Sequence, residues 1–276
     1  MLKKFCVLGN PIKHSKSPDI FKYFFNDLNI KAQYEACFIN NNASFKEFIL
    51  QTKNVYSGYN VTAPFKDFAF NMMDEVHSSA SSLESINCIN IVDNKLVGYN
   101  TDYYGFEMLL KCLNSINLTN KHFLVLGNGS TARTVSLALH NLFNKTIYLF
   151  GRNINNVNNF IKSMNQRITF SNAIVPYKAN SKAEYILINC LPMNITDKDV
   201  NFIFNSILLE NIEFLIDVNY VDNNLSNSLK DKNIQIVKGH DMLLFQALKN
   251  LDIWFDKKYS TKIDINKLRN NIFNNE

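Results

Sequence analysis

Residues 123–132 read FLVLGNGSTA, and this stretch decides how the chain folds. A short apolar strand ends in Gly127-Asn128-Gly129, and a helix begins directly after it. The stretch fits the pattern G-x-G-x-x-[GA], in which the glycines tighten the turn and let the backbone approach a pyrophosphate. The N-terminus of the helix then attracts the phosphate charge. G-x-G alone is also an ordinary turn, so the strand and the helix around it are what predict dinucleotide binding.

The chain after this stretch continues as strands and helices in alternation. A helix is expected with four apolar residues on one face, Val135, Ala138, Leu139 and Leu142. Further apolar strands are expected at Thr146–Phe150, Tyr185–Asn189, Phe214–Val218 and Gln235–Val237. Helices are expected at Met242–Phe255 and Ile265–Phe273. This alternation predicts a parallel sheet covered by helices, here a Rossmann-like domain over residues 103–239.

The strand after the glycine turn favours NADP over NAD. In such a domain an acidic residue at the end of this strand would hold the ribose 2′-OH of NAD, whereas an arginine accommodates the 2′-phosphate of NADP. Here the strand ends in Gly151-Arg152-Asn153, with no Asp or Glu close by. Arg152 is therefore expected to bind the 2′-phosphate, and the alternative is an arginine in a solvated loop.

The first hundred residues alternate in the same way. Strands are expected at Phe5–Leu8, Tyr34–Ile39 and Tyr59–Thr62, and helices at Ile20–Leu28, Ser44–Gln51 and about Phe65–Met73. A hairpin at Cys88–Val92 and Leu96–Tyr99 is expected on the edge of the sheet, before a long helix at Tyr103–Leu113. The fold class predicted is α/β with two domains. A mostly parallel first domain spans 1–102 and is completed by C-terminal helices at 240–276.

Residues 59–66, YNVTAPFK, form a junction between a strand and a helix that presents Lys66. Pro64 suits the first turn of a helix, where its missing N–H costs nothing. Thr62 is pushed toward extended geometry and is placed to cap that helix. Such junctions are common, so Lys66 taken alone is a weak functional signal.

Two further polar loops follow strands. Ser15 and Ser17 lie two residues apart and can hydrogen-bond a carboxylate or a diol, but capping is the better interpretation of Ser17 alone, since Pro18 follows it. Asp102 follows a strand and precedes a helix, and taken singly it is best interpreted as a first-turn acid. Beside Lys66 in space, its carboxylate would set the protonation state of the lysine.

Composition narrows the class of protein. Of 276 residues 46% are hydrophobic and 19% charged, as in soluble globular proteins. The net charge of +5 comes from Lys and Arg residues that are scattered along the chain. This distribution does not predict nucleic-acid binding and suits a small anionic ligand equally well. Five cysteines without a C-x-x-C pair favour reduced thiols in the cytoplasm, and five histidines without ligand spacing predict no metal. No segment is expected to be a signal peptide or to span a membrane.

Four segments together resemble the shikimate dehydrogenase family (shikimate/quinate dehydrogenases), in that family's order. Residues 60–66, NVTAPFK, are similar to its N-V-T-x-P-x-K, and residues 100–105, NTDYYG, match its N-T-D-x-x-G. Residues 239–247, GHDMLLFQA, match its G-x-x-M-L-x-x-Q-A, and residues 9–18, GNPIKHSKSP, look like its substrate loop. The glycine turn departs from the usual G-A-G-G-A, because it reads GNGST.

The resemblance implies reversible, NADPH-dependent reduction of 3-dehydroshikimate to shikimate in aromatic amino acid biosynthesis. It implies that Lys66 is catalytic, with Asp102 beside it. The implied substrate contacts are Ser15 and Ser17 to the carboxylate, Thr62, Asn87, Asp102 and Gln246 to the ring hydroxyls, and Tyr220. The implied cofactor contacts are Gly127, Asn128, Gly129, Ser130, Thr131, Arg152 and Gly239. The first domain would bind substrate and the second NADP.

Two alternatives stay open. One is a quinate/shikimate dehydrogenase that uses NAD, in which Arg152 would discriminate weakly between the cofactors. The other is a non-catalytic ligand sensor on the same fold, which would be expected to lack Lys66 or Asp102, whereas both are present. For the oligomeric state we expect a monomer or a homodimer.

Overall fold

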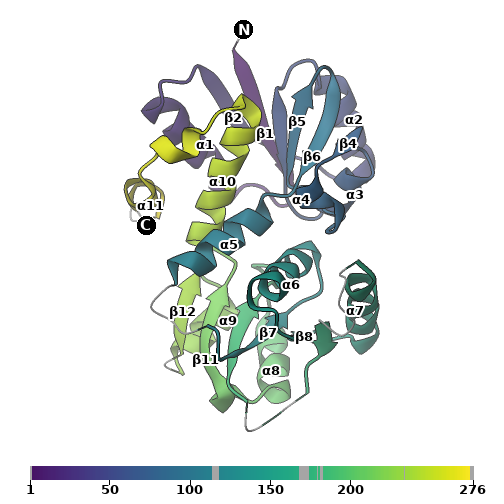
Figure 1. The fold of residues 1–276 in the computed structure, drawn as a ribbon, viewed down its shortest axis with the longest axis vertical. Coiled ribbons are helices and arrows are strands. Elements are labelled where there is room, and N and C mark those ends of the chain that lie inside the picture. Colours follow the sequence, from purple (N-terminus) through teal and green to yellow (C-terminus); the bar gives the residue numbers. More distant parts are fainter. Residues whose placement is uncertain are drawn as a thin grey trace. The chain divides into compact units, whose positions relative to one another are not determined.

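The computed structural model describes residues 2–113, 118–167, 174–178, 180, 183–232 and 234–273. The chain divides into two compact units, one made of Met1–Gly105 with Leu243–Glu276 and the other of Phe106–Met242. Each unit holds a six-stranded sheet accompanied by helices (Figure 1). The predicted α/β class, with a Rossmann-like second sheet and C-terminal helices that return to the first unit, is confirmed.

The sheet of the first unit is mostly parallel, as predicted. Its strands are β1 (Lys3–Gly9), β2 (Ala32–Phe38), β3 (Gly58–Val61), β4 (Glu75–Val76), β5 (Cys88–Val92) and β6 (Lys95–Tyr99), in the order β2-β1-β3-β5-β6-β4. Its helices are α1 (Ser17–Asp27), α2 (Asn42–Thr52), α3 (Lys66–Phe70), α4 (Ser78–Ser81) and α11 (Ile265–Phe273), with the 3-10 turn η2 (Tyr259–Lys262). Only the pairs β3–β5 and β5–β6 are antiparallel. Helices α5 (Asp102–Cys112) and α10 (His240–Phe255) have residues in both units.

Three local expectations around α3 and the β5–β6 hairpin were wrong. The helix expected at about Phe65–Met73 spans only Lys66–Phe70. Before it, the Phe65 N–H closes a turn on the Thr62 carbonyl 3.1 Å away, and after it the Asn71 N–H closes a turn on the Phe68 carbonyl 3.2 Å away. The turn before the helix contains the cis peptide Ala63–Pro64, so Pro64 precedes the helix and Thr62 does not cap it. The hairpin of β5 and β6 is not at the edge, because the two-residue strand β4 pairs with β6 beyond it.

The sheet of the second unit is entirely parallel. Its strands are β7 (His122–Leu126), β8 (Ile147–Phe150), β9 (Ile174–Pro176), β10 (Tyr185–Asn189), β11 (Ile212–Asp217) and β12 (Gln235–Lys238), in the order β12-β11-β10-β7-β8-β9. Its helices are α6 (Ser130–Phe143), α7 (Ile154–Arg167), α8 (Asp197–Ser206) and α9 (Asn224–Lys230), with the 3-10 turn η1 (Leu209–Asn211). On α6 the expected apolar face is buried except at Leu142, which is 39% exposed one residue before the helix ends.

An aromatic cluster joins helix α10 to the first sheet. Trp254, which is 3% exposed, stacks on Phe5 with 4.4 Å between ring centroids and lies 5.1 Å from Phe21. Its indole N–H donates to the Ile89 carbonyl 3.0 Å away on β5. Burial of large rings and a satisfied N–H together hold α10 against the strands that carry the site described below.

Gly58 on β3 leaves the space that this indole occupies. A Cβ at Gly58 would lie 2.5 Å from the Trp254 indole nitrogen and 2.7 Å from the Ile89 oxygen, the two atoms that share the hydrogen bond. Gly58→Ala is therefore expected to cost about 1–3 kcal/mol of unfolding free energy by overpacking. Urea unfolding followed by the fluorescence of Trp254, the single tryptophan, measures this loss.

Gly129→Ala is the matched control for that substitution. A Cβ at Gly129 would meet nothing within 4 Å, and its backbone φ of −87° suits any residue. The urea midpoint of the Gly129→Ala variant should stay close to that of the wild type. Equal losses in the two variants would contradict the steric explanation for Gly58.

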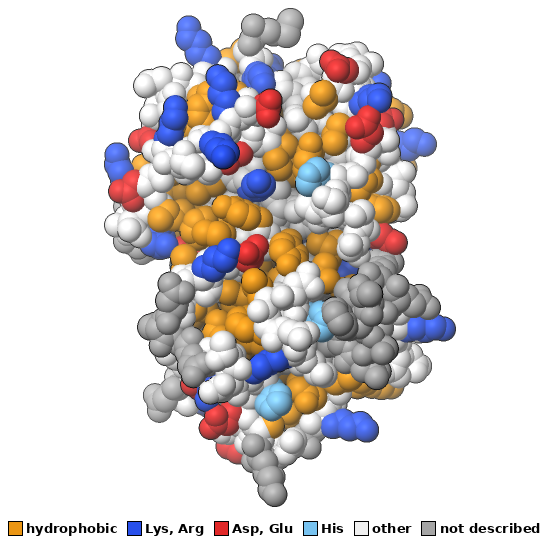
Figure 2. Space-filling view, in the orientation of Figure 1, with side chains coloured by type: hydrophobic (Ala, Val, Ile, Leu, Met, Phe, Trp, Pro, Cys, Tyr) orange, Lys and Arg blue, Asp and Glu red, His pale blue; other side chains and the backbone are white. Residues whose placement is uncertain are grey.

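Charges on the surface are mixed. On the face seen in Figure 2, Lys and Arg side chains are interspersed with Asp and Glu side chains. The described part of the chain contains no group of three or more His, Cys, Asp or Glu residues arranged to hold a metal ion. Among the same residues, every helix is too short or too polar to span a bilayer.

Candidate active site and dinucleotide site

Lys66 and Asp102 form an ion pair in the first unit. Lys66 is the first residue of α3, directly after the turn that ends β3, and Asp102 is the first residue of α5 after β6. The Lys66 Nζ donates to the Asp102 Oδ2 at 2.6 Å, and each side chain is 12% exposed. The N-terminal turn of α5 favours the negative charge of Asp102. The contact that the sequence could only suggest is therefore present, and the carboxylate fixes the direction of the ammonium group.

Asn87 holds the other oxygen of Asp102. Its Nδ2 donates to Asp102 Oδ1 at 2.8 Å and to Thr101 Oγ1 at 2.9 Å, while its Oδ1 accepts from the Thr101 N–H at 2.7 Å. Asn87 is 3% exposed. Both carboxylate oxygens thus have fixed donors, and the Lys66–Asp102 pair sits on a rigid buried support.

Gln246 on α10 is connected to Thr101 through Asn250. Neither Thr101 nor Asn250 is among the site residues predicted from the sequence. Asn250, fully buried, donates from Nδ2 to Gln246 Oε1 at 3.0 Å and accepts from Thr101 Oγ1 at 2.7 Å. A weaker contact of 3.5 Å joins Asn87 Nδ2 to the same Gln246 oxygen. Asn250 has a signal in the sequence, because it is polar within an apolar helix and lies four residues from Gln246, on the same face.

The predicted carboxylate loop lies in the same unit and leads into α1. The Ser17 N–H donates to Ser15 Oγ at 3.3 Å, while Ser17 is itself the first helical residue and makes no side-chain cap. The capping interpretation of Ser17 was therefore wrong, because the helix begins one residue earlier than a cap requires. Ser17 is 8% exposed, whereas Ser15 is more accessible.

Thr62 lies beside the start of this loop. Its N–H donates to the Leu8 carbonyl at 2.9 Å, and a Cβ on Gly9 would come within 2.4 Å of the Thr62 methyl group. The Asn10 N–H donates to the Ala63 carbonyl at 3.1 Å. The loop after β1 and the turn after β3 are thus tied together, which keeps the hydroxyl-bearing loop close to the turn that positions Lys66.

A second series of hydrogen bonds in the first unit connects β2, β3 and the residue before β5. The Tyr34 hydroxyl donates to Asn60 Oδ1 at 2.8 Å, and Asn60 Nδ2 donates to the Asn87 carbonyl at 2.9 Å. Burial raises the pKa of Tyr34 well above its usual value, so its hydroxyl stays a donor even in alkaline solution. Burial likewise raises the pKa of the Cys88 thiol, so this residue close to Asp102 is not a thiolate nucleophile.

In the second unit, the glycine turn between β7 and α6 has the geometry its sequence predicted. Gly127 has φ of +102°, and its N–H donates to the Phe150 carbonyl at 2.9 Å. Gly129 precedes the first helical residue, Ser130, with open space where a Cβ would be. Asn128, Ser130 and Thr131 belong to the same turn and first helical positions. The N–H groups at the start of α6 are therefore open to an anion.

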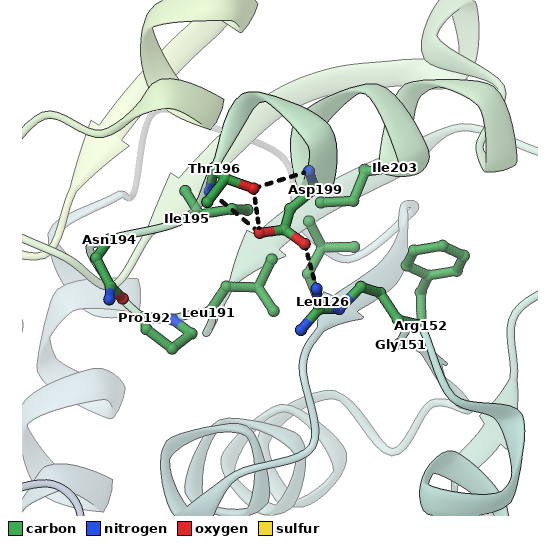
Figure 3. Close-up of a pocket in the computed structure, with 11 residues that line it drawn as sticks. Leu126, Gly151, Arg152, Leu191, Pro192, Asn194, Ile195, Thr196, Asp199 and Ile203 are labelled. Carbon is green, nitrogen blue, oxygen red and sulfur yellow. Dashed lines mark hydrogen bonds and ion pairs between the residues drawn. The ribbon is translucent and has the colours of Figure 1, made fainter.

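Arg152 lies at a pocket beside this turn, at the end of β8. The pocket has a volume of about 310 Å³ and is lined by Leu126, Phe150, Gly151, Arg152, Leu191, Pro192, Asn194, Ile195, Thr196, Asp199 and Ile203. Figure 3 shows the Arg152 guanidinium directed at Asp199 from α8, and its NH1 donates to Asp199 Oδ1. No local pattern in the sequence indicates this acidic partner, which is 47 residues away.

A fully buried carboxylate lies at the ends of the neighbouring strands. Asp217 Oδ1 accepts from Asn189 Nδ2 at 3.0 Å and from the N–H and Nδ2 of Asn219 at 3.1 and 3.0 Å. Its Oδ2 accepts from Asn223 Nδ2 at 2.9 Å, with Lys238 Nζ 3.6 Å away. Burial raises the pKa of Asp217, and Lys238 and the amide donors oppose the shift. These contacts fix the ends of β10, β11 and β12.

Gly239 and Tyr220 also lie in this unit. A Cβ on Gly239 would come within 2.1 Å of the Val218 carbonyl oxygen, so a glycine is required for packing there. The backbone carbonyl of Tyr220 is 3.0 Å from His240 Nε2.

The predicted site residues divide between the two units. Contacts in the first unit join four of them, Lys66, Asp102, Asn87 and Gln246, and the same unit holds Ser15, Ser17 and Thr62. Tyr220 and the predicted cofactor residues belong to the second unit.

Comparison with known proteins relates both the sequence and the fold of this chain to one family. A family model described as the shikimate dehydrogenase substrate binding domain matches residues 7–89. The shikimate dehydrogenase (NADP(+)) of Clostridium beijerinckii is 32% identical over 93% of this chain and 93% of its own. The shikimate dehydrogenase (NADP(+)) of Nitrosopumilus maritimus is 30% identical over 92% of this chain and 93% of its own. The crystal structure of shikimate dehydrogenase from Aquifex aeolicus superposes with a TM-score of 0.79 at 26% identity, covering 98% of this chain and 97% of that one.

Proposed function

Because this chain belongs to the shikimate dehydrogenase family, we propose that it catalyses the reversible reduction of 3-dehydroshikimate to shikimate with NADPH. The reaction belongs to aromatic amino acid biosynthesis. The observation that carries the proposal is the 2.6 Å Lys66–Asp102 pair, held by the buried amide of Asn87. A non-catalytic sensor would have no need of this pair.

The residues of the second unit fit NADP. The open N–H groups of the Gly127–Thr131 turn would hold the pyrophosphate, and Arg152 would hold the 2′-phosphate beside an apolar pocket for the adenine. Gly239 would approach the cofactor as part of the loop after β12. NADPH, when bound, supplies the hydride. Accordingly, residues 103–239 are the proposed NADP-binding domain, and residues 1–102 with 240–276 the proposed substrate-binding domain.

Lys66 is the proposed proton donor. Reduction of a ketone builds negative charge on the carbonyl oxygen, and an oriented ammonium group stabilises that charge and gives up a proton to it. Lys66 uses one N–H on Asp102, and an ammonium group has two more for the substrate oxygen. In the reverse direction the Lys66 Nζ takes the proton from the shikimate hydroxyl, and Asp102 holds the side chain in place.

The remaining polar residues of the first unit would orient the substrate. Ser15 and Ser17 would donate to its carboxylate, and Thr62, Asn87, Asp102 and Gln246 would bind its ring hydroxyls, with Tyr220 a further contact. A neighbouring Lys16 adds positive charge to the serine loop. Donor hydroxyls suit a carboxylate, and mixed amide and carboxylate groups suit hydroxyls that both donate and accept.

A spectrophotometric assay tests the function. With shikimate or quinate, each against NADP and NAD, the nicotinamide absorbance should rise fastest for shikimate with NADP. Fast quinate oxidation with NAD would instead establish the alternative quinate/shikimate dehydrogenase. Absence of turnover with all four pairs, in protein that binds shikimate, would favour a sensor and contradict catalysis.

We further propose that the protein works in the cytoplasm. No disulfide joins its five cysteines, all of which lie in the described part of the chain, and this pattern is typical of a reducing compartment. We propose a monomer or a homodimer as the active form. Sedimentation at assay concentrations distinguishes the two.

A further inference from the structure

The Arg152–Asp199 pair places a carboxylate on the wall of the pocket that the proposed function assigns to the adenosine half of NADP. The Asp199 side chain is 21% exposed and that of Arg152 is 73% exposed. Arg152 comes from the end of β8 and Asp199 from the first turn of α8 (Figure 3). Both side chains line the pocket, together with apolar residues such as Phe150 and Ile203. The pocket therefore offers a cation and an anion to whatever stands on the 2′ position of the ribose.

Asp199 is held rigidly and stays charged. Its Oδ2 accepts from the N–H and Oγ1 of Thr196 at 3.1 and 2.8 Å, and its own N–H donates to Thr196 Oγ1 at 3.3 Å, which forms a capping box. The N-terminus of the ten-residue helix α8 favours negative charge. Hydrogen bonds from Thr196 and the nearby guanidinium of Arg152 lower the pKa of Asp199. The carboxylate is thus a fixed anion at neutral pH.

A carboxylate and an arginine select opposite cofactors at this position. A carboxylate accepts a hydrogen bond from the free 2′-OH of NAD, whereas an arginine pairs with the 2′-phosphate of NADP. A phosphate bound at Arg152 would have to share the guanidinium with Asp199 and would be repelled by its charge. A 2′-OH carries no charge and meets an acceptor.

We propose that Asp199 is a specificity residue that lowers the preference of this protein for NADP over NAD, by occupying Arg152 and offering an acceptor to the 2′-OH. The proposal rests on the NADP site proposed above. It departs from the sequence prediction, in which Arg152 acts without an acidic neighbour. Asp199 does not touch the reacting atoms, so its effect belongs to cofactor affinity and not to the chemical step.

Calorimetric binding of 2′,5′-ADP and 5′-AMP tests the proposal without turnover. In Asp199→Asn the affinity for 2′,5′-ADP should rise about three- to tenfold, as expected for removing one partly screened charge, and that for 5′-AMP should stay or fall. The ratio of kcat/KM for NADP to that for NAD should rise by a similar factor. Asp199→Gln should do the same, because glutamine preserves a capping box without the charge.

Asp197→Asn is the matched control. Asp197 lies in the same first turn of α8, but it is exposed and accepts from Asn224 Nδ2 at 2.9 Å. This variant removes the same charge from the same helix and should leave the nucleotide preference near that of the wild type. Thermal melting of all three variants checks that α8 remains folded.

Two results would overturn the role of Asp199. Equal changes of nucleotide preference in Asp197→Asn and Asp199→Asn would mean that Asp199 acts only as a distant negative charge and not through Arg152. Weaker 2′,5′-ADP binding in both Asp199 variants would mean that the carboxylate orients Arg152 for the phosphate. If neither nucleotide binds the wild-type protein, the NADP site itself is refuted together with this proposal, whereas bound nucleotides with an unchanged preference refute only Asp199.

Discussion

Replacing Lys66 by alanine is expected to lower kcat for shikimate oxidation by about 100- to 10,000-fold, the range that general acid–base catalysis supplies. The Lys66 Nζ is the proposed proton carrier, and its 2.6 Å bond to Asp102 fixes its direction. Because other residues are proposed to bind the substrate's hydroxyls and carboxylate, KM for shikimate should change much less than kcat. Initial rates of nicotinamide absorbance with saturating shikimate and NADP measure both constants.

Two variants separate chemistry from charge and from folding. Lys66→Arg keeps the positive charge, but its guanidinium does not give up a proton, so kcat should stay low. Lys95→Ala removes another lysine of the same unit from an ion pair, the exposed 2.7 Å contact with Glu75, and should leave kcat unchanged. The fluorescence of Trp254 reports whether the first unit is folded in each variant. Undiminished turnover in folded Lys66→Ala would refute the proposed role.

Replacing Asp217 by alanine is expected to destabilise the second unit by about 3–5 kcal/mol, the cost of leaving several buried amide donors without their shared acceptor. Four N–H donors from Asn189, Asn219 and Asn223 converge on this fully buried carboxylate, with Lys238 beside it. Alanine would take away the acceptor of the Asn189 and Asn223 amide donors, whereas Lys238 would keep its 2.7 Å contact with Asp222. Hydrogen exchange of the Phe106–Met242 amides, read by mass spectrometry across a urea series, measures the loss where it occurs.

Asp222→Ala is the control for this prediction. Asp222 binds the same Lys238 at 2.7 Å, but its side chain is 50% exposed, and surface ion pairs contribute at most about 1 kcal/mol. A large loss for Asp222 and a small one for Asp217 would show that the lysine, and not the buried donor cluster, stabilises this part of the sheet.

The course of the chain could be predicted to a large extent from local patterns. Apolar runs placed β10 at Tyr185–Asn189 without error, and the glycine turn after β7 was correctly identified as a tight strand-to-helix connection. Such features depend on side-chain periodicity and on the backbone freedom of glycine, which neighbouring residues reveal. The prediction for the start of α3 was wrong. A turn with a cis peptide bond and a direct junction between a strand and a helix have the same residue pattern around Pro64.

Contacts between distant residues could not be predicted in this way. Lys66 and Asp102 are 36 residues apart, and only the resemblance to a family suggested their pairing. Thr101 and Asn250 are 149 residues apart and had no such guide. Whether a polar residue is buried against a partner depends on which strand ends and helix turns meet, and no local pattern carries that information.

The sequence by itself determined the α/β class, the alternation that builds two sheets, and the residue types suited to a hydride-transfer site. The tertiary structure alone decided that Asn250 supports Gln246, that Asp217 gathers the ends of three strands, and that Arg152 shares its pocket with Asp199. The physical reason is the separation along the chain over which each kind of interaction acts. Periodicity and turn chemistry act over a few residues, whereas the charge that a side chain meets is set by segments that the sheet order brings to the same edge.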